Sequence, residues 1–261
     1  MSFWISFNSW DGIAPTMQFV GLKNYVDQIA DADFRKSLLN TVIYSLMFIP
    51  LDLILALMLA IAVQKIKGKS FYRLFYFMPV VTGSVSVGVI WTWIMNGDFG
   101  LLNTILGAVG ITGPKWLTDP KIVLFSIVIV SVWWNVGYNM VLLLAGLQNI
   151  PEVYYEAAEI DGANKWKAFR HITLPMLSPT LFFVLIMTII SSFQVFDQAY
   201  VMTQGGPMKA SYTLVYHIYQ GAFVEFRMGG ACAASVILFA IILAITMIQM
   251  YGSKRWVNYE Q

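Results

Sequence analysis

Long stretches that are almost free of charged residues constrain the fold of this chain most. Between Lys36 and Lys65 the only charged residue is Asp52, and no charge lies between Lys121 and Glu152. A helix that crosses the hydrocarbon core of a bilayer needs about 20 mostly apolar residues. Five stretches meet this requirement, and we predict membrane spans at residues 38–63, 74–95, 122–147, 177–201 and 231–251.

Composition supports helices in a membrane. Apolar residues make up 58% of the 261 residues and charged residues 11%, whereas soluble domains average about 45–50% and about 25%. Lipid offers no partner for backbone N–H and C=O groups, so helices must satisfy them internally. The stretches also lack the strict alternation of a transmembrane β-barrel. We therefore predict an all-α, polytopic transmembrane helical bundle, with residues 1–261 forming a single domain.

The distribution of Lys and Arg predicts the orientation, because these residues concentrate in cytoplasmic loops. With five spans, one side receives four of them in residues 65–73, three in 165–170 and two in 254–255. The other side receives four, at positions 115, 121, 209 and 227, and three more in residues 23–36. We predict that the carboxyl terminus is cytoplasmic and the amino terminus is outside.

An external amino terminus with no span before it would need a special export route. The chain begins with "MSFWISFNSW", an aromatic-rich string typical of the outer end of a transmembrane helix in the aromatic belt. We expect a sixth helix upstream of Met1 in the full-length protein. The alternative is a protein with five spans.

Known motifs of catalysis do not occur in the sequence. A lone Cys232 excludes a disulfide framework, and His171 and His217 are too far apart for a helical metal pair. "KGKS" at residues 67–70 resembles the end of a phosphate-binding loop, but Val63 stands where that motif needs Gly. The net charge of +2 is too small to suggest nucleic-acid binding. We predict that the chain is not an enzyme and binds no metal or nucleotide itself.

Residues 150–175 form a charged, amphipathic segment between two apolar stretches. Three acidic residues share one helical face: Glu152, Glu156 and Glu159. Gly162 is a natural helix end, Asn164 can cap a second short helix, and Pro175 is expected to end that helix. One interpretation is a linker that lies on the membrane. The acidic face is repelled by anionic lipid, however, and favours docking to a basic protein partner.

The spacing within this segment resembles a known motif. Glu156-Ala157-Ala158, three residues, Gly162, nine residues, and then Ile172-x-Leu174-Pro175 is similar to the EAA loop of bacterial ABC-importer permeases. Further stretches resemble the carbohydrate-uptake branch of that family, in the subunit that corresponds to the maltose F-type or glycerol-phosphate A-type permease. They are "FVGLKNY" (19–25), "FYRLFYFMPVV" (71–81), "IWTWIMNGDFGLLNTIL" (90–106), "DGANKWKAFRHITLP" (161–175) and "FQVFDQAYVMTQGGP" (193–207).

The resemblance implies a bacterial inner-membrane protein with the type I importer permease fold. Such a chain would form half of a translocation pathway for a sugar or sugar-like solute. Its implied partners are a second permease in a heterodimer, two cytoplasmic ATPase subunits and an extracytoplasmic solute-binding protein. ATP and Mg²⁺ would belong to the ATPases, and no cofactor to this chain. Family members usually have one more amino-terminal helix, and Asp52 within a span is not expected.

The resemblance also assigns roles within residues 150–175. This segment would be the cytoplasmic coupling loop that sits in a cleft of one ATPase. Glu156 would face basic groups of the ATPase, and Gly162 would form the turn. The residues implied in ATPase coupling are Glu156, Ala157, Ala158, Asp161, Gly162, Ile172, Leu174 and Pro175.

Polar residues within two spans are candidates for contact with a sugar. Asn135, Tyr138 and Asn139 lie in the third span, and Gln194 and Asp197 in the fourth, where a spacing of three would align them on one helical face. Intramembrane polar residues often line a pathway, although Asn and Gln also hold helices together. Asp52 is equally suited to pairing with another helix or to lining the pore. His217 is expected in an outer loop.

Two other functions remain as alternatives. An ion-gradient-driven secondary transporter would show internal repeats and buried acidic coupling sites. Asp52 and Asp197 give only weak support for such acidic sites. An intramembrane enzyme would need a nucleophile, metal or paired-acid constellation that the sequence does not show.

Overall fold

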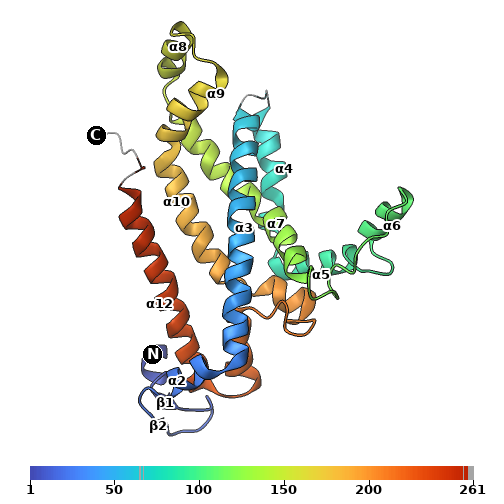
Figure 1. Cartoon of the computed structure of the whole chain (residues 1–261), viewed down its shortest axis with the longest axis vertical. Coiled ribbons are helices and arrows are strands. Elements are labelled where there is room, and N and C mark those ends of the chain that lie inside the picture. The colour runs from blue at the N-terminus through green and yellow to red at the C-terminus, as the bar shows by residue number, and fades with distance from the viewer. Residues whose placement is uncertain (65, 67, 255, 258–261) are drawn as a thin grey trace. The chain divides into compact units, whose positions relative to one another are not determined.

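The computed structural model describes residues 1–64, 66, 68–254 and 256–257 (Figure 1). Four helical segments in these residues are long and apolar enough to cross a membrane: Ala32–Gln64 (α3), Val123–Gln148 (α7), Lys165–Phe193 and Met228–Ser253 (α12). They confirm the predicted spans at 38–63, 122–147 and 231–251. The fold is an all-α polytopic bundle, and the predicted count of five is reached if α4 and α5 together form one span.

The predicted span at 74–95 is wrong as a single helix. It consists of α4 (Lys69–Val81) and α5 (Ser84–Ile94), separated by Thr82 and Gly83, which are both extended with ψ of 135° and 132°. Pro79 removes one backbone N–H near the end of α4. The Thr82 carbonyl accepts a hydrogen bond from Trp134 Nε1 at 3.2 Å, which satisfies a group that the break frees. Hydropathy alone cannot separate a broken apolar helix from a straight one.

The predicted span at 177–201 is displaced toward the amino terminus. A continuous helical segment includes α9 (Lys165–Ala168), the π-helix η1 (Phe169–Thr173) and α10 (Leu174–Phe193). Pro175 therefore does not end the second helix of the charged segment. The wider turn of η1 ends at Thr173, two residues before Pro175, and such turns accommodate a residue that lacks an N–H. Helix α10 ends at Phe193, so Gln194 and Asp197 do not share a helical face as predicted.

The chain divides into two compact units. The first comprises Met1–Phe48, Gly83–Ser131 and Ile190–Ala244, and the second Ile49–Thr82, Val132–Ile189 and Ile245–Gln261. The first unit contains short elements outside the long helices. They are α1 (Ser2–Ile5), β1 (Asn8–Ser9), β2 (Gln18–Phe19), α2 (Lys23–Ala30), α6 (Leu101–Ala108), η2 (Ala199–Thr203), α11 (Leu214–Tyr219) and η3 (Gln220–Val224). Strands β1 and β2 pair antiparallel, with Asn8 opposite Phe19.

His217 is not a plain loop residue as predicted, because it lies in α11 of the first unit and is buried. Its Nε2 lies 2.9 Å from Gln28 Oε1, and its Nδ1 lies 3.4 Å from the Tyr212 hydroxyl. Burial lowers the pKa of His217, and the carboxylates of Asp31, Glu225 and Asp33 oppose this shift. A neutral imidazole that joins α11 to α2 follows from this environment.

The second unit packs its helices closely around α7. A Cβ atom on Gly137 would clash with the Tyr76 carbonyl oxygen of α4, and one on Gly146 would lie 2.6 Å from Thr180 Oγ1 of α10. Small residues allow this approach between membrane helices. The interior side chains of α7 are fully buried aliphatic residues: Met140, Leu143, Leu144 and Leu147. The charged segment that follows α7 therefore starts from a firmly packed helix.

Candidate functional site

The charged segment folds as the sequence predicts up to its second helix. Helix α8 (Glu152–Ile160) follows Pro151, and Gly162 adopts the left-handed conformation with φ of 72°. The Ala163 N–H donates to the Ala158 carbonyl at 2.8 Å, and the Gly162 N–H to the Glu159 carbonyl at 3.0 Å. These two bonds form a Schellman motif, which closes the carboxyl end of α8.

The next helix begins with a side-chain cap. Asn164 Oδ1 accepts a hydrogen bond from the Lys167 backbone N–H at 2.9 Å, which satisfies one of the free donors of a helix start. Helix α9 then continues through η1 into α10. Because this helix is continuous, its first turn belongs to the same helical segment as a membrane span.

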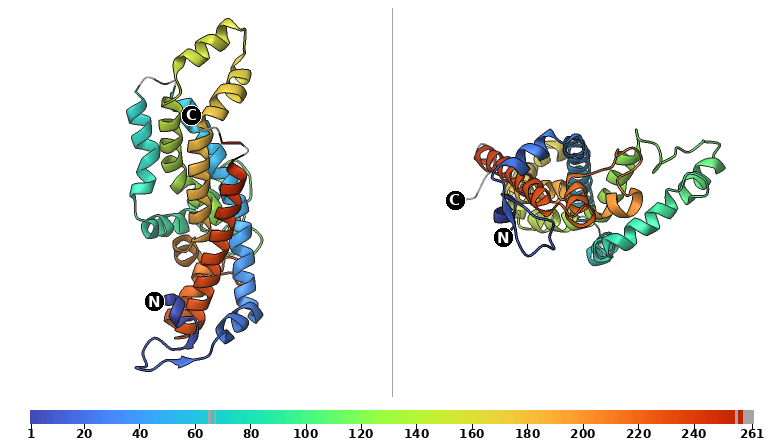
Figure 2. Two further views of the ribbon diagram at one scale, coloured as in Figure 1. Left: turned by 90° about the vertical axis from the view of Figure 1, so that its left-hand side faces the viewer. Right: turned by 90° about the horizontal axis from the view of Figure 1, so that it is seen from below.

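Helix α8 has no buried residue. It lies beyond the ends of α7 and α10 in both side views of the chain (Figures 1 and 2). An isolated helix shorter than about 12–15 residues is marginal in water, so nine residues need further support. Four carboxylates belong to α8 and to the residue that caps its end: Glu152, Glu156, Glu159 and Asp161. None of them forms an ion pair within the described residues. The helix thus presents an exposed acidic surface.

One side-chain contact holds α8 against the following helix. The hydroxyl groups of Tyr155 and Thr173 lie 2.9 Å apart, and Thr173 is buried in η1. Neither residue was a sequence candidate, because the pairing depends on how the loop folds back. The hydrogen bond orients α8 relative to the start of α10.

The residues of the EAA-like motif occupy both arms of this loop. Glu156, Ala157, Asp161 and Gly162 are exposed, and Ala158 is half-buried. Ile172, Leu174 and Pro175 lie on the continuous helix and are half-buried. The first group is therefore largely accessible, and the second is partly enclosed.

The polar residues of the third span form a cluster with Asp52. Asn139 Nδ2 donates to Asp52 Oδ2 at 2.5 Å and to Thr188 Oγ1 at 2.9 Å, and Asn135 Nδ2 donates to Asp52 Oδ2 at 3.2 Å. Asp52 is fully buried, and its Oδ1 has no hydrogen-bond partner within the described residues. The cluster joins α3, α7 and α10, which favours the helix-pairing interpretation for Asp52 and Asn139. Asn135 is half-buried, and Tyr138 is 38% exposed.

The other two polar candidates lie in the first unit. Asp197 is half-buried, and its carboxylate accepts a hydrogen bond from the Ser84 hydroxyl at the start of α5. Gln194 is exposed in the non-helical stretch after α10. Among the described residues, no group of three His, Cys, Asp or Glu side chains could hold a metal ion.

Comparison with known proteins assigns the chain to a family. Residues 33–258 match the binding-protein-dependent transport system inner membrane component family. The chain belongs to this family. It is 36% identical over 251 residues to the sn-glycerol-3-phosphate transport system permease protein UgpA of Agrobacterium fabrum, covering 95% of this chain and 85% of that protein. It is 35% identical over 253 residues to the trehalose/maltose transport system permease protein MalF of Thermococcus litoralis, covering 95% and 84%.

A solved structure confirms the fold. A chain of a bacterial alginate ABC transporter in complex with alginate pentasaccharide-bound periplasmic protein has a TM-score of 0.82 and 21% identity, covering 90% of this chain and 83% of that chain. Family membership makes this chain the inner-membrane permease subunit of an ATP-driven ABC importer, and not an enzyme. It also favours this function over that of an ion-gradient-driven secondary transporter.

Proposed function

We propose that this permease carries a sugar or sugar-like solute, and that residues 150–175 couple it to an ATPase. The names of relatives that transport sn-glycerol-3-phosphate and trehalose or maltose support the solute class. A second permease completes the pathway as a heterodimer, an extracytoplasmic binding protein delivers the solute, and two cytoplasmic ATPases hold the ATP and Mg²⁺. No cofactor is bound by this chain.

The exposed acidic helix α8 is the observation that carries the coupling proposal. It is nine residues long, buries no side chain of its own, and is fixed at its base by Tyr155 and Thr173. Glu156 faces basic groups of the ATPase, while Ala157 and Ala158 allow close approach. When the ATPases close, α8 moves with them, and the continuous helix from Lys165 to Phe193 carries the displacement into the membrane as a rigid body.

Within the pathway, the proposed solute contacts are Asn135, Tyr138, Gln194 and Asp197. Asn139 is a weaker candidate, because both N–H groups of its amide are used in hydrogen bonds between helices. Asn and Asp side chains offer hydrogen bonds to sugar hydroxyl groups, and Tyr138 adds a partly exposed aromatic face.

A charge reversal tests the coupling proposal. We expect Glu156→Lys to abolish co-purification with the ATPase and ATP-dependent uptake into proteoliposomes, because it sets a cation against a basic partner surface. The matched control is Asp98→Lys, which reverses an exposed carboxylate on the opposite predicted side and should leave both unchanged. Undiminished co-purification and uptake by Glu156→Lys would contradict the proposal. A ligand screen of the cognate binding protein identifies the solute.

A further inference from the structure

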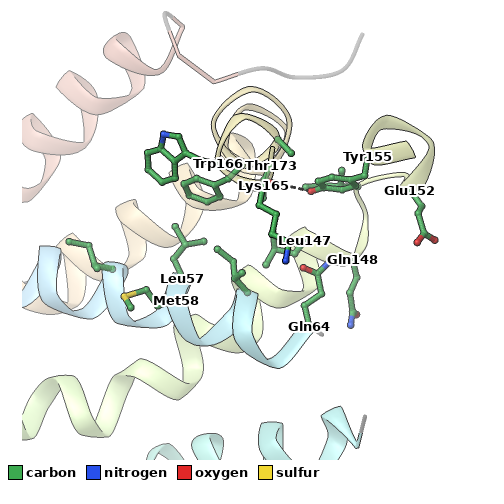
Figure 3. Close-up of a pocket in the computed structure, with 15 residues that line it drawn as sticks. Leu57, Met58, Gln64, Leu147, Gln148, Glu152, Tyr155, Lys165, Trp166 and Thr173 are labelled. Carbon is green, nitrogen blue, oxygen red and sulfur yellow. Dashed lines mark hydrogen bonds between the residues drawn. The ribbon is translucent and has the colours of Figure 1, made fainter. Parts of the chain in front are cut away.

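A large cavity lies between residues 150–175 and the ends of α3 and α7. Its volume is about 960 Å³, and all its lining residues belong to the second unit. The walls come from the last turns of α3, the end of α7, the start of α8, and α9 with η1 (Figure 3). The EAA-like motif contributes none of its residues to this wall, so the cavity is separate from the surface that those residues form.

The cavity is apolar at one end and polar at the other. Ile54, Leu57 and Met58 line it along α3, and two of them are strongly exposed, Ile54 at 58% and Met58 at 62%. Gln64 and Gln148 line the opposite end. Figure 3 shows this separation along α3. A site with one apolar and one polar end fits an amphiphilic molecule.

A positively charged side chain, that of Lys165, reaches the polar end of the cavity. The Lys165 side chain extends along the cavity, and its amine points toward Gln64 (Figure 3). No ion pair within the described residues involves Lys165. Glu152 also lines the cavity, but its carboxylate points away from Lys165 (Figure 3). The charge that an occupant meets inside the cavity is therefore positive.

The length of the α3 wall, from its apolar end to its polar end, matches one leaflet of a bilayer. Ile54 and Gln64 are separated by ten residues of one helix, which is about 15 Å at the rise of an α-helix. The hydrocarbon core of a bilayer is about 30 Å thick, so one leaflet contributes about 15 Å. Gln64 is the last residue of α3, which places the polar end where the lipid headgroups begin.

We propose that this cavity binds one anionic phospholipid of the cytoplasmic leaflet, with its phosphate on Lys165 and an acyl chain along Ile54, Leu57 and Met58. The side of the membrane rests on the proposed orientation of the coupling segment. Basic pockets between membrane helices on the cytoplasmic side recognise anionic headgroups in this way. Because Tyr155 and Thr173 also line the cavity, the bound lipid supports the contact that orients α8.

Quenching of Trp166 fluorescence tests the proposal. Trp166 lines the cavity and is 66% exposed, so an acyl chain brominated along its length quenches it on contact. The full chain, with any subunits that co-purify, is placed in nanodiscs containing brominated phosphatidylglycerol or brominated phosphatidylcholine. The fluorescence of Trp166 is obtained by subtracting the fluorescence of Trp166→Phe from that of the native protein. This subtraction removes the contribution of every other tryptophan.

We expect brominated phosphatidylglycerol to quench Trp166 at about fivefold lower mole fraction than brominated phosphatidylcholine, since one Lys beside an anionic lipid contributes about 1 kcal/mol. Lys165→Gln should remove this preference. Lys167→Gln, on the same helix but outside the cavity wall, should retain it. Equal quenching of Trp166 by both lipids, or no quenching of Trp166 by either lipid, would overturn the proposal. Because no ATPase is required, this result is independent of the coupling test.

Discussion

Asp52 has an environment unlike that of an ordinary membrane span. It is a fully buried carboxyl group in α3, and it accepts hydrogen bonds from Asn135 and Asn139 of α7. Asn139 also donates to Thr188 of α10. A buried polar group destabilises the fold unless it has partners. Asp52 therefore acts as the central acceptor of a connection among three helices.

Removal of this acceptor should destabilise the protein. We expect Asp52→Ala to cost about 1–3 kcal/mol, because it leaves the amide groups of Asn135 and Asn139 short of partners in a buried site. Asp52→Asn keeps an acceptor oxygen and should cost less. The measurement is the thermal unfolding midpoint in detergent, followed by aggregation or by fluorescence.

A matched control lies on the same helix. Ser45 is buried, and its hydroxyl has no hydrogen-bond partner within the described residues, so Ser45→Ala should leave the midpoint unchanged or raise it. Equal midpoints for Asp52→Ala and the native protein would show that the cluster does not hold the helices together.

Sequence patterns predicted single residues well where the cause is local. Gly162 and Asn164 end and begin helices through their own conformation and side chain, and both assignments are confirmed. The partners of Asp52 could not be predicted, because they depend on which faces of α3, α7 and α10 meet. The same limit applies to Tyr155 and Thr173, which come together only after the loop folds back.

At the scale of elements, the turn between α8 and α9 sets the shape of the proposed coupling loop. Gly162 has φ of 72°, and a Cβ atom placed there would meet nothing within 4 Å. The requirement for glycine is therefore conformational and not steric. An L-residue in this region of backbone space costs about 1 kcal/mol.

We predict that Gly162→Ala weakens ATPase binding by about fivefold. The turn must keep its positive φ when α8 docks, and this conformation costs an alanine about 1 kcal/mol. Titration of the ATPase against the permease in nanodiscs measures this change. Gly21→Ala is the control, because Gly21 also has positive φ and open surroundings but lies in the amino-terminal region. If both variants bind the ATPase as the native chain does, the turn is not part of the docking surface.

Element boundaries show where hydropathy is insufficient. The length of the charge-poor apolar runs predicted three spans correctly, but it could not show the break at Thr82 and Gly83. Run length also could not show that the helix continues from η1 into α10 and past Pro175. Both features depend on how backbone hydrogen bonds are rearranged near a proline, which a hydropathy average does not register.

At the scale of the whole molecule, the orientation follows from a small excess of basic residues. Nine Lys and Arg residues lie on the predicted cytoplasmic side, and seven on the other side when the amino-terminal segment is included. The coupling proposal provides an independent reason for the same orientation, because ATP is available only in the cytoplasm. Residues 150–175 and the carboxyl terminus are then on that side.

Cysteine accessibility tests this orientation, and the chain suits the method because Cys232 is its only cysteine and is buried. In a Cys232→Ser background, we predict that Lys115→Cys reacts with a membrane-impermeant maleimide in intact spheroplasts. Asp161→Cys, which replaces an exposed residue of the coupling loop, should react only after the membrane is permeabilised. The opposite pattern would place the acidic helix outside the cell, where no ATPase could reach it, and would exclude the coupling role of α8.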